Sequence, residues 1–285
     1  MPDAAVAEPL LPVTPNIRRA LGAGAAGLAA AGCETPRLDA ELLLCAALGG
    51  GWDRARLLMA DLEPLDGDLL GGYERLLARR RAREPVAYIV GFKDFRRIRL
   101  AVDRRVLIPR AETELLVEVG LTLAHGASVA DVGTGSGAVA LALKQERPDL
   151  ELTGIEISAE ALAVARQNAC RLGIEIGLVQ ADLLDTDRYD VVLANLPYVP
   201  AHGSELAPEI TRYEPALALY AGADGMGVLR RLISRVERTA VRVIALEVDP
   251  RQASAVADLL HSAGFAAIER IADLAAHERV VVGRR

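Results

Sequence analysis

From about residue 111 onward, short apolar runs of strand length alternate with longer stretches in which apolar residues recur at helical spacing. Such alternation is typical of a parallel sheet whose strands are joined by crossover helices. The runs that we expect to be strands are Ser128–Val132, Leu152–Ile157, Gly177–Val179, Val191–Ala194, Val241–Glu247, Ala267–Ile271 and Arg279–Val282, with a helix from about Pro250 to Ala263 before the last two. Seven strands in this order predict a doubly wound α/β sheet, which binds ligands beyond the carboxyl ends of its strands.

The first part of the chain has a different pattern. From about Asn16 to Arg83 it is compatible with helix throughout and shows no strand-like alternation, which predicts a small all-helical domain. Between Glu84 and Arg110 the apolar residues alternate as in a β-hairpin, with strands at 86–90 and 98–102 and a turn near Lys93 and Asp94. The expected organisation is therefore a helical domain (1–85), a hairpin linker (86–110) and an α/β domain (111–285).

Composition narrows the class of protein. The 285 residues carry a formal net charge of −6 and only 4% aromatic residues, so neither the overall field nor a supply of stacking rings favours nucleic acid. Three cysteines and four histidines are scattered without the spacing of a disulfide framework or a metal site. The N-terminus lacks the basic flank of a secretory signal, and the apolar stretch at 20–31 is shorter than the roughly 20 residues of a membrane span. We expect a soluble cytoplasmic protein with no metal and no membrane association.

A glycine-rich segment follows the first expected strand of the sheet, where backbone without side chains can approach a ligand closely. It comprises Asp131, Gly133, Thr134, Gly135, Ser136 and Gly137. Glu156 comes at the end of the next strand and is placed to accept hydrogen bonds from both ribose hydroxyls of an adenosine. The same pattern fits a nicotinamide dinucleotide, but a carboxylate at Asp131 would repel a pyrophosphate and suits the ammonium group of a methionine moiety. Charge therefore favours S-adenosylmethionine as the cofactor.

A further acidic residue, Asp182, follows the third expected strand and precedes Leu183. From that strand end it could accept from the adenine amino group of the cofactor, and the alternative is a turn or helix-capping role. We favour the cofactor role because ligands of such sheets bind at the carboxyl ends of the strands.

The fourth expected strand runs directly into Asn195, Leu196, Pro197 and Tyr198, at the same sheet edge as the glycine-rich segment. This tetrapeptide resembles the (Asn/Asp)-Pro-Pro-Tyr signature of methyltransferases that modify the nitrogen of planar amino groups. In those enzymes the Asn side-chain oxygen and the next carbonyl accept the two N–H bonds of the substrate, while the Tyr ring packs over it. An amide nitrogen is a poor nucleophile, so acceptors that hold it as it pyramidalises favour the transition state. No strong general base is required.

The resemblance becomes specific outside that tetrapeptide, because the chain is similar over nearly its whole length to the protein-(glutamine-N5) methyltransferases that modify peptide chain release factors. The segments that carry this similarity are Thr35–Leu43, Glu84–Gly91, Leu107–Glu114, Arg212–Pro215 and Gly222–Gly225. It implies a seven-stranded Rossmann-like class I methyltransferase sheet and transfer of a methyl group to the glutamine of a Gly-Gly-Gln loop, in support of translation termination. It also implies that residues 1–85 bind the release factor and that Arg110 contacts the substrate near the active-site entrance.

One departure from the family keeps a second function open. Leu196 stands where the family more often has proline, and Asn-Leu-Pro-Tyr also resembles the motif of ribosomal RNA adenine dimethylases. The alternative function is methylation of the adenine amino group in ribosomal RNA or DNA. A basic run could then follow phosphates, and it consists of Arg79, Arg80, Arg81, Arg83, Lys93, Arg96, Arg97, Arg99, Arg104 and Arg105. We favour a solvated face that offsets acids elsewhere, or a mixed case in which some arginines meet an RNA-like or acidic partner surface.

Positions beside these motifs lead to local predictions. Arg110 and Glu114 are spaced for an i, i+4 ion pair on a helix. Tyr213 and Glu214 are expected to pack over the acceptor pocket. Glu247, which ends the fifth expected strand, is expected to orient neighbouring backbone groups.

Overall fold

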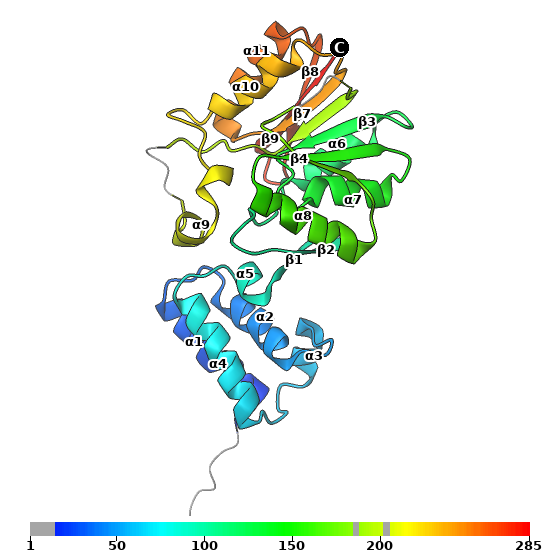
Figure 1. Cartoon of the computed structure of the whole chain (residues 1–285). Coiled ribbons are helices and arrows are strands. Elements are labelled where there is room, and N and C mark those ends of the chain that lie inside the picture. Colours follow the sequence, from blue (N-terminus) through cyan, green and yellow to red (C-terminus); the bar gives the residue numbers. More distant parts are fainter. Residues whose placement is uncertain (1–14, 185–187, 202–205) are drawn as a thin grey trace, which may run out of the picture. The chain divides into compact units, whose positions relative to one another are not determined.

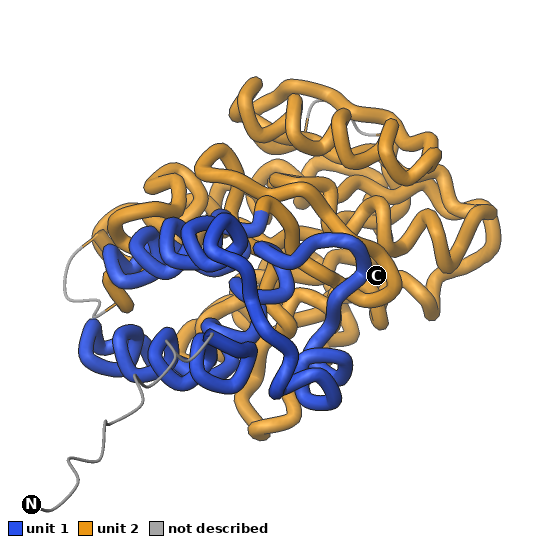
Figure 2. Tube along the Cα trace, turned by 90° about the horizontal axis from the view of Figure 1, so that it is seen from below, with its two compact units in different colours: residues 1–90 blue, residues 91–285 orange. Residues whose placement is uncertain are grey.

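The computed structural model describes residues 15–184, 188–201 and 206–285. The chain divides into two compact units, Met1–Val90 and Gly91–Arg285, which Figure 2 draws in different colours. Each unit has a buried apolar core of its own. The division falls within the segment that the sequence pattern treats as a single hairpin linker.

The described part of the first unit is helical. Its helices are α1 (Ile17–Ala30), α2 (Pro36–Leu48), α3 (Arg54–Met59), α4 (Gly67–Arg81) and α5 (Val86–Val90). Three of them begin after a side chain that accepts a backbone N–H of the first turn, namely Asn16, Asp53 and Asp66. Apolar side chains from several helices fill the core between them, as expected from the helical pattern of this region.

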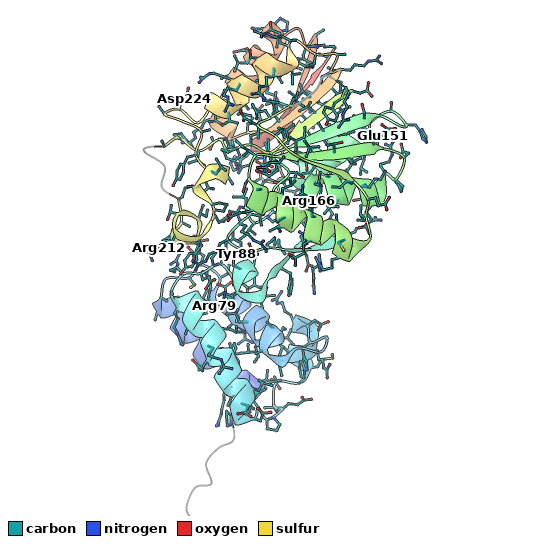
Figure 3. The ribbon with its side chains drawn as sticks, in the orientation of Figure 1. Arg79, Tyr88, Glu151, Arg166, Arg212 and Asp224 are labelled. Atoms are coloured by element: carbon teal, nitrogen blue, oxygen red, sulfur yellow. The ribbon has the colours of Figure 1, made fainter. Side chains whose placement is uncertain are left out.

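Residues 86–90 correct one prediction, because the sequence pattern predicts a strand there and the structure contains the short helix α5. The fixed backbone angle of Pro85 suits a first helical turn, and its carbonyl accepts from Tyr88 at 3.0 Å and Ile89 at 3.1 Å. Ile89 is buried in the core of the first unit. Arg79, labelled with Tyr88 in Figure 3, donates to the Tyr88 carbonyl at 3.4 Å. Local packing therefore outweighs the strand-like composition of this segment.

The second unit is built around a seven-stranded sheet in the order β5-β4-β3-β6-β7-β9-β8. Its strands are β3 (Ser128–Val132), β4 (Glu151–Glu156), β5 (Gly177–Gln180), β6 (Val191–Ala194), β7 (Val243–Glu247), β8 (Ala267–Ala272) and β9 (Glu278–Arg284). The five strands from β3 to β7 are parallel to one another, whereas β9 is antiparallel to both β7 and β8. The chain steps from β3 outward to β5 and then returns to β6 on the other side of β3. This reversal places the ligand crevice at the carboxyl ends of β3 and β6.

Helices cover both faces of this sheet (Figure 1). One face carries α6 (Glu114–Leu121), α7 (Ala138–Glu146) and α8 (Ala159–Leu172), and the other carries α10 (Gly227–Val236) and α11 (Ala253–Ser262). A short helix, α9 (Pro208–Tyr213), lies between β6 and α10 in the sequence. The predicted seven-stranded α/β architecture is confirmed, and each strand differs from its expected bounds by at most two residues.

A separate antiparallel pair, β1 (Phe92–Phe95) and β2 (Ile98–Ala101), precedes this sheet in the sequence. Its turn falls at Arg96 and Arg97, so the prediction of a turn near Lys93 and Asp94 is wrong. Arg96 adopts a left-handed backbone conformation, with a φ of 48°, which is uncommon for a residue with a side chain. Its guanidinium forms ion pairs with the carboxylates of Glu118 on α6 and Glu146 on α7. These ion pairs hold the turn at Arg96 and Arg97, although the residue types there do not indicate a turn.

Candidate active site

One cavity of the second unit opens at the carboxyl ends of β3 and β6 and encloses about 1210 Å³, its open mouth included. Most of the predicted site residues line it, namely Asp131, Gly133, Thr134, Gly135, Ser136, Glu156, Asp182, Leu183, Asn195, Leu196 and Pro197. Gly137, Tyr198 and Arg110 are not among its lining residues. Two motifs that are far apart in the sequence therefore meet in a single pocket.

The glycine-rich segment turns sharply after β3. Gly133, Gly135 and Gly137 have φ values of 76°, 55° and 84°, a backbone conformation that strongly favours glycine. A Cβ added at Gly135 would come no closer than 3.9 Å to its nearest neighbour, so the backbone there is bare toward the cavity. A Cβ added at Gly133 would lie only 2.9 Å from Cδ2 of Leu196. The loop thus offers its backbone to a ligand while it touches the acceptor motif.

Asp131, the residue before the end of β3, is only 2% exposed. Its Oδ2 accepts from the Thr134 hydroxyl at 2.6 Å and from the Ala140 backbone N–H at 3.2 Å. Burial raises the pKa of this carboxyl to about 6, against the opposing effect of these two hydrogen bonds. A cation bound beside Asp131 would favour its ionised form. The residue therefore suits a ligand that carries a positive charge.

Glu156 comes at the end of β4 and is also buried. Its Oε2 accepts from the backbone N–H of Gly135 at 3.0 Å, and its Oε1 accepts from that of Ser158 at 2.9 Å. The carboxylate thus supports the glycine loop as well as lining the cavity. Each carboxylate oxygen has a second acceptor position, which ribose hydroxyls can occupy.

Asp182 lies at the rim of the cavity, and its side chain is 42% exposed. Its carboxylate forms ion pairs with Arg231 and, at 3.4 Å, with Arg235 of α10. Neither arginine was singled out from the sequence. The pairs hold Asp182 at the pocket rim, where it was expected.

Asn195 directly follows β6, and its side chain has a defined orientation. Its Nδ2 donates to Oγ1 of Thr113 at 3.0 Å. Thr113 is 4% exposed and lies at the start of α6, far from Asn195 in the sequence. Because the NH₂ end of the amide is engaged by Thr113, the oxygen end is turned the other way. In the sequence, Thr113 is distinguished only as part of the longer similar segment Leu107–Glu114.

Leu196 takes the place of the more usual proline with its side chain buried in the core of the second unit. It is 5% exposed and lies against the glycine loop at Gly133. Packing therefore restrains this residue in the absence of a proline ring. Its backbone carbonyl is available to the motif whatever the side chain.

Tyr198, the partly buried last residue of the motif, pairs with the buried Glu247. The Tyr198 hydroxyl donates to Oε1 of Glu247 at 3.5 Å, and Glu247 is only 2% exposed. Burial raises the pKa of Glu247 to about 7; the charge of Glu112 adds to the rise, whereas hydrogen bonds from Thr113 and Tyr198 and the charge of Arg279 oppose it. Within the described residues, Glu247 Oε2 has no hydrogen-bond partner. Glu247 thus binds side chains, and not the backbone groups that the sequence analysis expects.

Arg110 forms its ion pair with Glu214, so the predicted i, i+4 pair with Glu114 is wrong. The reason is that α6 begins only at Glu114, and Arg110 is not in a helix. Glu214 is buried and also accepts from the Ile108 backbone N–H at 3.1 Å, which anchors the segment before α6. Glu114 instead accepts from the Arg96 backbone N–H at 3.2 Å.

The expected packing of Tyr213 and Glu214 over the pocket is not what the structure contains. Neither residue lines the cavity, whereas Pro215 and Leu217 do. The Tyr213 ring lies instead beneath the guanidinium of Arg104, whose carbon is 4.8 Å from the ring centre. Glu214 therefore acts on the site through the backbone that it anchors.

Most of the basic run is engaged by acids of the same unit. The ion pairs are Arg79–Glu84, Arg80–Asp39, Arg81–Glu74, Arg96–Glu146, Arg99–Asp94 and Arg105–Asp103. Arg83 donates to the carbonyls of Ala31 and Gly32. Paired arginines present little net charge to a phosphate backbone, which favours the interpretation of a solvated, charge-balanced face.

Among residues 15–184, 188–201 and 206–285, no three His, Cys, Asp or Glu side chains come together as a possible metal site. None of the helices among them has the length and apolar character to span a membrane.

The donor set of the cavity fits one ligand in particular. S-adenosylmethionine requires three features that this cavity has. The backbone at Gly135 is bare, the buried carboxylate of Asp131 suits a cation, and the carboxylate of Glu156 can accept from vicinal hydroxyls. A dinucleotide would instead bring its pyrophosphate close to Asp131. The fold and this site define an S-adenosylmethionine-dependent methyltransferase of the class I, Rossmann-like kind.

Comparison with known proteins identifies the family within that class. The family models for the PrmC N-terminal domain and the methyltransferase small domain match residues 19–91 and 111–212. The chain is 40% identical to the release factor glutamine methyltransferase of Burkholderia pseudomallei, over 87% of this chain and 91% of that protein. It is 38% identical to that of Mycolicibacterium smegmatis, over 95% and 98% of the two chains. The chain belongs to the release factor glutamine methyltransferase family.

Among solved structures, the catalytic domain of hMettl16 has a similar fold, with a TM-score of 0.51. The two chains are 13% identical, and the match covers 65% of this chain and 74% of that one. At this level of identity the likeness concerns the fold alone.

Proposed function

We propose that this enzyme transfers the methyl group of S-adenosylmethionine to the side-chain amide nitrogen of the glutamine in the Gly-Gly-Gln loop of peptide chain release factors. The observation that carries the proposal is that Asn195, from the acceptor motif, lines the same cavity as Asp131 and Glu156. Donor and acceptor groups that share a cavity can hold the two reactants at bonding distance. The names of the relatives supply the identity of the acceptor.

On the donor side, each acid receives one part of the cofactor. Asp131 accepts from the ammonium of the methionine moiety, Glu156 from the ribose hydroxyls and Asp182 from the adenine amino group. When bound, S-adenosylmethionine supplies an electrophilic methyl group on a sulfonium. The positive charge of the ammonium lowers the pKa of the Asp131 carboxyl from its raised value. Asp131 is then ionised, and its negative charge strengthens the binding of the cofactor.

On the acceptor side, two oxygens receive the N–H bonds of the substrate amide. They are Oδ1 of Asn195 and the backbone carbonyl of Leu196. The amide nitrogen is a weak nucleophile because its lone pair is delocalised, and it regains that lone pair only as it pyramidalises. Acceptors that bind the hydrogens best in that geometry lower the barrier. Alignment of the nitrogen with the methyl carbon lowers the activation free energy further, by an amount that can reach about 7–11 kcal/mol.

The partner is proposed to contact the helical unit as well as the cavity. The described part of the first unit exposes five large apolar side chains, and three of them, Leu58, Met59 and Leu62, are more than 60% exposed and close together in the sequence. Exposed apolar side chains that gather in this way are typical of a surface that binds a partner. Residues 1–85 are therefore proposed as the release factor binding domain. Lys93 and Arg97 of the basic run are the positions where contact with an RNA-like or acidic partner surface is proposed.

A methyl-transfer assay tests this function. Purified enzyme with labelled S-adenosylmethionine is expected to label a release factor, and to leave unlabelled the same factor whose loop glutamine is replaced by alanine. Asn195→Ala should lower kcat by on the order of 10²–10³, because it removes an acceptor used in the transition state. Cofactor affinity, measured by calorimetry, should change little.

The same assay with ribosomal RNA and DNA covers the other acceptor class. Methylated adenine in the product, with no label in the release factor, would overturn the proposal. Equal losses in cofactor affinity and in kcat for Asn195→Ala would contradict the role given to Asn195.

A further inference from the structure

The side-chain amide of asparagine has two ends of similar shape and opposite function. A half-turn about its last side-chain bond exchanges an acceptor oxygen for a donor NH₂. With its oxygen toward the substrate, Asn195 accepts an N–H bond of the glutamine amide. With its NH₂ group toward the substrate, two donors would face each other and the productive complex would be lost. Catalysis therefore requires a means of fixing this orientation.

Thr113 provides the contact at the NH₂ end. Its Oγ1 accepts from Asn195 Nδ2 at 3.0 Å, and the threonine is buried at the start of α6. A hydroxyl has one hydrogen as well as its lone pairs, so on its own it could donate to a carbonyl oxygen or accept from an amide. Thr113 enforces one orientation of Asn195 only if its own hydrogen is engaged elsewhere.

The acid assigned to that hydrogen is Glu247, which is buried and accepts from the Tyr198 hydroxyl at 3.5 Å. Interaction with the Thr113 side chain opposes part of the rise in the pKa of Glu247 that burial causes, so the two side chains are neighbours. A carboxylate only accepts, and a protonated carboxyl with its hydrogen on Oε2, the oxygen without a partner, still accepts at Oε1. Both protonation states therefore direct the two hydroxyl hydrogens toward Glu247.

From this geometry we propose that Thr113 and Glu247 are positioning residues, which set the amide of Asn195 so that its oxygen faces the acceptor nitrogen. In this proposal Asn195 donates to Thr113 and Tyr198 donates to Glu247, as the distances of 3.0 Å and 3.5 Å show, and Thr113 donates to the same carboxyl. The chain of hydrogen bonds links both ends of the acceptor motif to a single buried acid. This inference rests on the proposed role of Asn195 in binding the substrate amide.

Substitution of Thr113 tests the proposal. Thr113→Val keeps the shape and removes the hydroxyl, so kcat for the methylated acceptor should fall about 10–100-fold, as for other residues that orient a functional group. Thr113→Ser keeps Oγ and should stay within about threefold of the wild type. The affinity for S-adenosylmethionine should be unchanged in both variants. Thr122→Val is the matched control, because Thr122 lies at the other end of α6 and its hydroxyl donates only to its own helix, at Val119.

A second background separates orientation from packing. In Asn195→Asp the side chain has an oxygen at either end, so its orientation no longer decides whether an acceptor faces the substrate. Adding Thr113→Val to Asn195→Asp should therefore lower kcat by less than about threefold. The same substitution in the wild-type enzyme, which keeps Asn195, should lower kcat by about 10–100-fold. Equal losses in the two backgrounds, or a loss in Thr113→Ser as large as in Thr113→Val, would overturn the proposal. If Asn195→Asp has no turnover, the comparison of the Ser and Val variants decides.

Wild-type turnover is measured first, on the release factor and on nucleic acid. An enzyme that methylates neither would contradict the proposed function. An active wild type with equal losses in the two backgrounds would contradict only the positioning role of Thr113.

Discussion

The two halves of the cavity are built in different ways. On the cofactor side, Asp131 bonds with Thr134 and Ala140, and Glu156 bonds with Gly135 and Ser158, all within one strand-loop-helix unit and its neighbouring strand. On the acceptor side, Asn195 bonds with a residue 82 positions away and Tyr198 with one 49 positions away. Around Asp131 and Glu156 the cofactor half is thus a local structure, whereas Asp182 at its rim pairs with Arg231 and Arg235 of α10. The acceptor half exists only when distant parts of the second unit have come together.

The halves also differ in how they stabilise buried charge. Three of the four contacts on the cofactor side come from backbone N–H groups, whose positions are fixed by the fold. The acid of the acceptor side, Glu247, accepts from the side-chain hydroxyl of Tyr198, and within the described residues its other oxygen has no partner. We therefore expect the acceptor half to be the more sensitive of the two, both to remote substitution and to pH.

The largest expected effect comes from a glycine that is distant from the acceptor motif in the sequence but touches it in space. Gly225 has a φ of 73°, and a Cβ there would lie 2.2 Å from the Tyr198 carbonyl oxygen and 2.8 Å from Nε2 of Gln252. Gly225→Ala should lower the free energy of unfolding by on the order of 4 kcal/mol, through backbone strain and overpacking together. Urea denaturation measures this loss.

The matched control is Gly222→Ala, which has a similar φ of 82° and nothing within 4 Å of the added Cβ. It should cost only about 1 kcal/mol, from backbone strain alone. The Gly225→Ala protein that remains folded should bind S-adenosylmethionine normally and transfer methyl poorly. Equal costs for the two variants would show that contact with Tyr198 has no special weight.

The second effect is a pH dependence carried by Glu247. Burial raises its pKa to about 7 in the folded protein, from the ordinary value of 4.5 for a glutamate side chain, so between these two pH values the native state holds a proton that the unfolded state has lost. The stability of the wild type relative to Glu247→Gln should therefore fall as the pH rises from 4.5 to 7.5, by about 3 kcal/mol in total. Thermal or urea unfolding of both proteins across this range provides the measurement. A difference that stays constant with pH would mean that Glu247 ionises at its ordinary pKa.

The smallest effect is expected on the cofactor side. Glu156→Gln retains one acceptor oxygen and loses the charge that two backbone N–H groups stabilise. We expect the Kd for S-adenosylmethionine to rise about 10-fold, with kcat nearly unchanged at saturating cofactor, since uniform binding is lost and not transition-state binding. Calorimetry and steady-state kinetics distinguish the two quantities. A fall in kcat as large as that of Asn195→Ala would remove the distinction between the halves.

The same contrast explains what sequence could predict. Strand β6 is buried on both faces and reads as a continuous apolar run, and β3 is apolar except for Ser128 and Asp131, so the positions of both strands follow from the pattern. The glycine loop and Glu156 follow from local rules for strand ends. Most of the cofactor half was therefore predictable residue by residue.

The acceptor half was predictable only in its contiguous motif. Nothing in the spacing of Thr113 and Asn195 indicates that they meet, because their contact depends on how α6 packs beside β6. The partner of Arg110 could not be predicted for the same reason. Glu214 lies 104 positions away in the sequence, whereas the nearer Glu114 has the i, i+4 spacing of a helical ion pair. The helix at 86–90 was missed because Pro85 and core packing outweigh the strand preference of valine and isoleucine.

Leu196 carries one more consequence. Its side chain belongs to the apolar interior, and only its carbonyl belongs to the motif. The side chain at this position can therefore change with the hydrophobic residues around it, while the substrate meets the same backbone oxygen. The leucine reflects the packing of the interior. It does not distinguish a protein amide from a nucleobase as the source of the NH₂ group.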